Sequence, residues 1–129
     1  MTAKVTFVER KASSFVSIER VFRHVNEALD RRFQASFVQL PFNNSFLGLI
    51  KNLLTFKRPE SDIYHVTGHS HYIALRLPRN KTIVTVHDLF FMNNRTGIRR
   101  LLLKKLYLDW PLKRTNVVTA ISEATRNEI

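Results

Sequence analysis

The chain has 129 residues, 44% of them hydrophobic and 24% charged, which fits one globular domain with a core of its own. It has no cysteine, which excludes a disulfide framework and cysteine-based zinc sites, and none of its apolar runs approaches the ~20 residues of a membrane span. With 21 Lys and Arg against 10 Asp and Glu, the net charge is +11, which favours polyanions, acidic lipid surfaces or phosphorylated ligands without choosing among them.

Strands alternate with helices in the predicted order of elements. In chain order we expect a strand at Lys4–Val8, a helix at Ser17–Phe33, a strand at Ala35–Leu40, a helix at Phe46–Phe56, a strand at Ile63–Thr67, one or two helical turns at Tyr72–Leu77, a strand at Ile83–His87, a helix at Gly97–Trp110, a strand at Val117–Ile121 and a helix after Ser122. Such alternation indicates βαβ units and therefore an α/β fold, a parallel sheet of about five strands with helices on both faces.

The bounds of two helices rest on particular residues. Ser17 is the expected N-cap of the first long helix, and Glu19 suits its first turn because the helix dipole favours negative charge there. Pro111 is expected to end the later basic helix.

Three of the predicted strands run into polar residues. His87 and Asp88 follow the fourth strand, Gly68 and His69 follow the third, and Ser122 comes after the fifth. The carboxyl ends of parallel strands are where ligands bind, so we expect these residues to form one site. His87 is the strongest candidate, because imidazole carries protons and donates to sugars or phosphates; the alternative is a strand-end histidine bonded to nearby backbone.

The remaining candidates each have a structural alternative. Asp88 either orients His87 or serves as a turn residue. Ser122 and Glu123 either meet a ligand at a helix N-terminus or act as a cap and a first-turn charge. Gly68 permits a tight turn after its strand. His69 and His71 resemble the start of a metallo-β-lactamase signature, but the aspartate and histidine that should follow are absent, so we predict no metal site.

Three segments together resemble a known family. DIYH at residues 62–65, KTIVTVHDL at 81–89 and NVVTAISEATRNEI at 116–129 occur in the order found in the N-terminal domain of family 4 glycosyltransferases, and RKASSFVSIERVF at 10–22 is similar to the opening of some bacterial members. The resemblance implies a Rossmann-like domain over residues 1–129, one half of the two-domain GT-B architecture. The second, C-terminal domain would lie outside this chain.

The resemblance also implies an activity. Such enzymes move a sugar from a nucleotide-sugar donor to an acceptor hydroxyl with retention at the anomeric carbon and without a metal or other cofactor, here in bacterial glycan or lipid-linked saccharide synthesis. His87 would lie near the donor sugar, while Gly68 and His69 would line the acceptor side. Many relatives have glycines in the loop after the first strand, but Glu9–Val16 has none, so phosphate binding there is not carried over. We expect little or no activity from these 129 residues alone.

Other partners follow from charge and pattern. The segment 97–114 is basic and rich in Leu and Trp, as interfacial membrane helices are, although a buried helix with basic stems explains it as well. We expect a cytoplasmic protein, with peripheral contact at the inner membrane face as a further hypothesis. The alternative to an enzyme is a stand-alone module that binds a glycan or a partner. No nucleic-acid-binding motif is present, so we expect no nucleic-acid partner.

Overall fold

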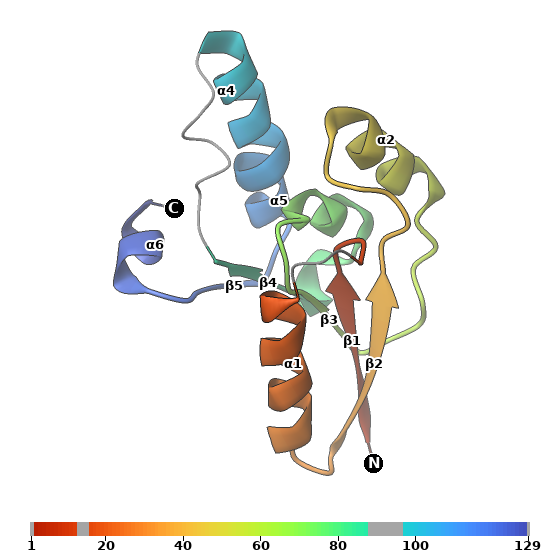
Figure 1. Cartoon of the computed structure of the whole chain (residues 1–129). Coiled ribbons are helices and arrows are strands. Elements are labelled where there is room, and N and C mark those ends of the chain that lie inside the picture. The colour runs from red at the N-terminus through yellow and green to blue at the C-terminus, as the bar shows by residue number, and fades with distance from the viewer. Residues whose placement is uncertain (1, 13–15, 88–96, 129) are drawn as a thin grey trace.

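A computed structural model describes residues 2–12, 16–87 and 97–128, without the side chains of residues 99, 103, 107 and 128. Within these ranges five strands form one parallel sheet in the order β2-β1-β3-β4-β5 (Figure 1). The strands are β1 (Ala3–Glu9), β2 (Phe33–Gln39), β3 (Ile63–Val66), β4 (Thr82–Val86) and β5 (Val117–Ala120). The predicted α/β fold, a Rossmann-like parallel sheet, is confirmed.

Helices connect successive strands and cover both faces of the sheet. They are α1 (Ser17–Ala28), α2 (Phe46–Thr55), the 3₁₀ helices η1 (His71–Arg76) and η2 (Arg79–Lys81), α4 (Gly97–Lys104), the π-helical turn η3 (Lys105–Asp109), α5 (Trp110–Lys113) and α6 (Glu123–Glu128). α1 packs on one face, and α2, η1 and η3 pack on the other. The prediction of helices on both faces is therefore correct.

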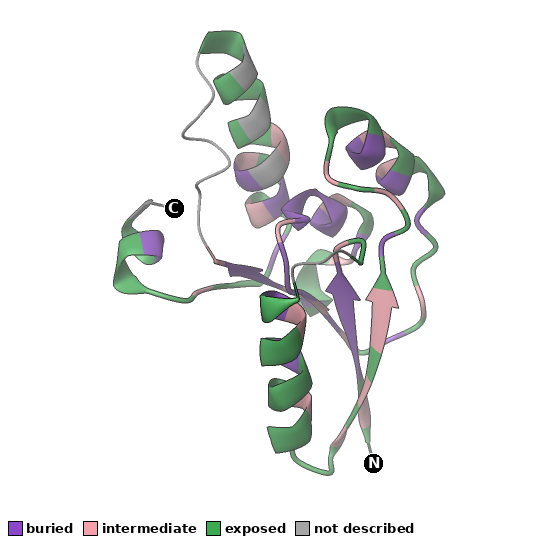
Figure 2. Ribbon diagram, viewed as in Figure 1, coloured by how far each residue is buried: buried purple, intermediate pink, exposed green. Residues whose placement is uncertain are grey.

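The two faces of β1 belong to two separate cores, because successive side chains of a strand point to opposite sides. Phe7 packs with Phe22 of α1 in the smaller core, while Val8 belongs to the larger core with Leu49 of α2 and Tyr72 of η1. Burial falls toward the edge of the sheet: most of β1 and β4 is buried, whereas β5 is largely exposed (Figure 2).

The first long helix is shorter than its apolar pattern predicts. It ends at Ala28, and Leu29 is extended with φ −67° and ψ 142°. The amide of Phe33 then donates to Asp30 in a turn, and β2 begins at Phe33 because that residue pairs with Ala3 of β1. The pairing of Phe33 with the sheet thus ends the helix earlier than its apolar period alone predicts.

Ser17 is not the N-cap of α1, contrary to the prediction. Val16 occupies that position, and the helix has no side-chain cap hydrogen bond. The amide of Arg20 donates to the carbonyl of Val16, so Ser17 is already inside the first turn. Glu19 lies in the first turn as expected.

Pro111 does not end the basic helical segment, which continues to Lys113. The amide of Trp110 donates to the carbonyl of Lys105, five residues back, so the backbone has already left the α pattern. Pro111 then lies in the first turn of α5, where a missing N–H is tolerated. The expected stop fails because the π turn places the proline at a helix start.

Apolar residues of this segment divide between the core and the surface. Leu108 is buried in the larger core, whereas Ile98, Leu101 and Trp110 are exposed. No helix within the described residues combines the length and the apolarity needed to cross a membrane.

Candidate functional site

The chain reverses direction across the sheet between β1 and β3. From β1 it passes outward to β2, and it then returns to place β3 on the other side of β1. In open α/β sheets a ligand crevice forms at such a point, outside the carboxyl ends of the strands. The side chains at these ends belong to Glu9, the last residue of β1, and Arg10 after it, to Thr67 and His69 after β3, and to His87 after β4.

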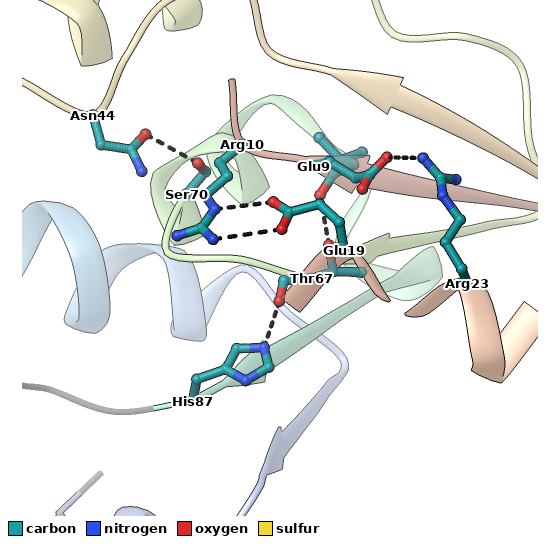
Figure 3. Close-up of polar contacts among 9 residues, drawn as sticks. Glu9, Arg10, Glu19, Arg23, Asn44, Thr67, Ser70 and His87 are labelled. Atoms are coloured by element: carbon teal, nitrogen blue, oxygen red, sulfur yellow. Dashed lines mark hydrogen bonds and ion pairs between the residues drawn. The ribbon is translucent and has the colours of Figure 1, made fainter. Parts of the chain in front are cut away.

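His87 is held at both its ring and its backbone. Its Nε2 lies 2.6 Å from the carbonyl oxygen of Thr67 (Figure 3). A carbonyl oxygen only accepts, so Nε2 carries the proton and donates, which makes Nδ1 the acceptor nitrogen of the neutral ring. The Thr125 hydroxyl donates to the carbonyl of His87 at 3.1 Å. The imidazole is therefore fixed in one orientation and one tautomer.

Gly68 and His69 lie beside His87, as the strand-end pattern predicts. The rings of His69 and His87 have centroids 6.1 Å apart. Gly68 is buried, and a Cβ built on it would lie in ordinary contact with the stem of Arg10, at 3.6 Å. Its φ is not positive, since Gly97 is the one described residue with a positive φ. The bend at Gly68 therefore does not require the left-handed backbone region.

Ser122 acts as a helix cap. Its Oγ accepts from the amide of Thr125 at 3.1 Å, and the same hydroxyl group donates to Thr125 Oγ1. Because Thr125 also holds the backbone of His87, the cap ties the start of α6 to the end of β4. Glu123 points to the surface, 79% exposed, and pairs with Arg126 at 3.3 Å. Asp88 lies outside the described residues.

Two ion pairs join β1 to α1 beside this site (Figure 3). Arg23 Nη2 donates to Glu9 Oε1 at 3.0 Å, and Arg10 binds both oxygens of Glu19, at 2.9 and 3.4 Å. Burial raises the pKa of Glu9, against the opposing charge of Arg23. Burial acts to raise the pKa of Glu19, but the hydrogen bond to Arg10, a backbone hydrogen bond and the charges of Arg10 and Arg23 together outweigh it, and the net shift is downward.

Sequence reasoning missed these four residues. The signal was present: Glu9 and Arg10 follow an apolar strand just as His87 does, and Glu19 and Arg23 are spaced by four, which puts them on one side of a helix. What the sequence does not show is that this side of α1 faces the end of β1.

A third histidine, His65, lies below the site on the face covered by α1. Its ring packs against Phe22 with centroids 5.0 Å apart, and its Nε2 lies 2.6 Å from the hydroxyl of Thr85. That hydroxyl is 2.7 Å from the hydroxyl of Thr119, so the polar chain crosses three strands. Burial, together with the charge on His87, lowers the pKa of His65 to about 4. His65 is therefore neutral at physiological pH.

The histidines of this edge do not gather into a metal centre in the part of the chain that the structure describes. His69 and His71 have ring centroids 6.5 Å apart, and His71 is fully buried. No group of three or more His, Asp or Glu side chains among the described residues is arranged to hold a metal ion.

Comparison with known proteins gives no match: no family model, no curated protein and no solved structure matches the chain. The geometry of the strand ends and the order of the motifs are thus the grounds for a functional inference.

Proposed function

We propose that this chain is the N-terminal, acceptor-side domain of a retaining glycosyltransferase that moves a sugar from a nucleotide-sugar donor to an acceptor hydroxyl. Two observations support the proposal. The sheet is parallel and its strand order reverses between β1 and β3, the kind of place where open α/β sheets bind ligands. The strand-end motifs that resemble family 4 enzymes end at the same edge of that sheet.

The orientation of His87 is the observation that carries the proposal. The Thr67 carbonyl fixes the Nε2 proton, so Nδ1 can accept a hydrogen bond from a sugar hydroxyl. Protonation of Nδ1 would turn the same nitrogen into a donor to a phosphate oxygen. Because the ring is already fixed, little side-chain entropy is lost when a sugar binds.

Other residues of the edge have smaller roles in this proposal. Gly68 and His69 would line the acceptor side next to His87. Arg10 is engaged by Glu19, so it offers little to a donor diphosphate unless that pair opens. We therefore assign the diphosphate to a second Rossmann-like domain that faces this edge.

The experiment measures binding of UDP-glucose, as a representative nucleotide sugar, to the 129-residue chain by saturation-transfer NMR. We expect saturation transfer to the sugar protons of UDP-glucose in the wild type and the loss of this signal in His87→Ala. His24→Ala is the matched control, because His24 is 80% exposed and should leave transfer unchanged. The proposal fails if His87→Ala binds as well as the wild type.

Turnover separates the proposal from its alternative. The chain alone should transfer no sugar above the His87→Ala background, because the diphosphate site belongs to the second domain. A stand-alone glycan-binding module would instead bind free oligosaccharide as tightly as the nucleotide sugar. That result would favour the module and reject the transferase.

A further inference from the structure

A hollow lined by arginines lies at the amino ends of the strands, whereas His87 lies at their carboxyl ends. Its volume is about 460 Å³, and it is lined by Arg58, Leu75, Arg76, Leu77, Pro78 and Arg114. This volume is within the ~300–1,000 Å³ of typical small-molecule sites. Its lining combines three arginines with two leucines and a proline.

The hollow is separate from the strand-end site. Its three arginines belong to the connections that lead into β3, β4 and β5, at the amino ends of these strands. The strands are four, five and four residues long. At ~3.3 Å per residue, roughly 15 Å of sheet lies between the hollow and His87. A ligand bound here would not occupy the proposed sugar cleft.

The backbone around the hollow is fixed by internal hydrogen bonds. Arg76 Nη2 donates to the carbonyl of Phe56 at 3.3 Å, which links two lining segments. Leu77 is buried, and its amide donates to Ala74 at 3.1 Å. The amide of Arg114 donates to Pro111 at 3.1 Å. The Arg76 side chain is therefore tied to the segment that carries Arg58, and the three arginines are exposed to solvent.

Positive charge at the hollow is not balanced by carboxylates. No acidic residue lines it, and within the described part of the chain Arg58, Arg76 and Arg114 form no ion pair. This differs from Arg10 and Arg23, which both pair with glutamates. Further bases flank the lining segments: Lys57, Arg79, Lys81 and Lys113. The nearest acids in sequence are Glu60 and Asp62, and Asp62 accepts the amide of Lys4.

We propose that this arginine hollow binds the phosphate groups of a small anionic ligand. Guanidinium forks match phosphate oxygens in pairs, and Arg keeps its charge at every physiological pH. Three such groups around one hollow suit a ligand with more than one negative charge. The apolar lining residues Leu75, Leu77 and Pro78 suit an uncharged body attached to the phosphate. The inference stands independently of the transferase proposal.

Calorimetric titration tests the site with tripolyphosphate, a soluble probe that carries no lipid or base. The variant combines Arg58→Gln, Arg76→Gln and Arg114→Gln, and its matched control combines Lys11→Gln, Arg20→Gln and Arg31→Gln, exposed residues that do not line the hollow. Both lower the net charge by the same amount. We expect the hollow variant to bind at least about tenfold more weakly, and the control within about twofold of the wild type.

A second probe identifies the source of the phosphate. Short-chain phosphatidic acid, used as a soluble monomer, should displace tripolyphosphate if the ligand is a lipid headgroup, and should fail to do so if the ligand is a free phosphate compound. Amide and guanidinium chemical shifts should move at Arg58, Arg76 and Arg114 in either case. Equal weakening in both triple variants would show non-specific attraction to a basic surface and overturn the proposal, as would no binding by the wild type.

Discussion

Replacement of Arg23 by alanine should destabilise the protein in a pH-dependent way. Glu9 is only 1% exposed, and Arg23 Nη2 at 3.0 Å is the hydrogen-bond donor to its Oε1. The other oxygen, Oε2, is buried without a hydrogen-bond partner among the described residues. Arg23→Ala would therefore leave a buried carboxylate with no compensating donor.

The cost has two parts. Loss of a charge-assisted hydrogen bond to a buried carboxylate is worth about 1.5–3 kcal/mol, and we take the lower end because Arg23 is 46% exposed and partly hydrated. The Arg23 guanidinium also lies 3.5 Å from the centroid of the Phe37 ring, a contact worth about 0.5–1 kcal/mol at an exposed site. We expect a total of about 2–3 kcal/mol near neutral pH.

Acid should remove the first part and leave the second. Burial raises the pKa of Glu9 above its ordinary 4.5, so at pH 4.5 more of this carboxyl is protonated in the folded protein than in the unfolded chain. In the wild type, the raised pKa of Glu9 adds to the free energy of unfolding at low pH. This contribution is complete below the unfolded-state pKa and is lost as pH rises through the folded-state pKa. A neutral Glu9 has no charge to leave uncompensated, so Arg23→Ala should then cost about 0.5–1 kcal/mol.

Urea unfolding of four proteins measures the effect: wild type, Arg23→Ala, Glu9→Gln and the double variant. In the Glu9→Gln background, Arg23→Ala should lower the free energy of unfolding by about 0.5–1 kcal/mol both near neutral pH and at about pH 4.5. Arg20→Ala, an exposed residue of the same helix, is the control and should cost no more than about 0.5 kcal/mol. A cost of Arg23→Ala that is the same at both pH values, or the same with and without Glu9, would refute the reasoning.

Two further predictions concern a partly buried histidine and an exposed helix. Burial, together with the charge on His87, lowers the pKa of His65 from 6.5 to about 4, so its contribution to stability is complete above 6.5 and is lost as pH falls toward 4. Across that pH window the free energy of unfolding of the wild type should fall by about 3 kcal/mol. His65→Gln should abolish this fall, and a variant that keeps the pH dependence of the wild type would contradict the prediction. The exposed Ile98 and Leu101 of α4, beside its bases, predict binding to anionic vesicles. Ile98→Ser with Leu101→Ser should weaken vesicle co-sedimentation about tenfold while Leu54→Ser, an exposed position on α2, does not; equal losses would reject α4 as the contact.

Local pattern was sufficient for the type and order of most elements. β1 is predicted from its apolar run, and the helix expected at Phe46–Phe56 is found as α2. The structure adds its cap, Ser45, whose hydroxyl accepts the amide of Gly48. Boundaries were harder where a neighbour decides them. The end of α1 and the start of β2 depend on the pairing of Phe33 with Ala3, which is a contact between residues far apart in the chain.

The candidate site shows the same division. His87 and His69 could be placed at one edge from sequence, because parallel strands share the direction of their carboxyl ends. The tautomer of His87 could not, since it depends on the carbonyl of Thr67 in another strand. Nor could the low pKa of His65, which follows from its burial beneath Phe22.

By itself, then, the sequence determined that this is a basic α/β protein with polar residues at the ends of its strands, because hydrophobic period and strand-end chemistry are local properties. The tertiary structure decided which charges meet. It placed Glu9 against Arg23 and left Arg58, Arg76 and Arg114 around one hollow with no acidic partner among the described residues. The reason is physical: burial and charge pairing depend on distances through space between segments, and the spacing of residues along one chain does not specify them.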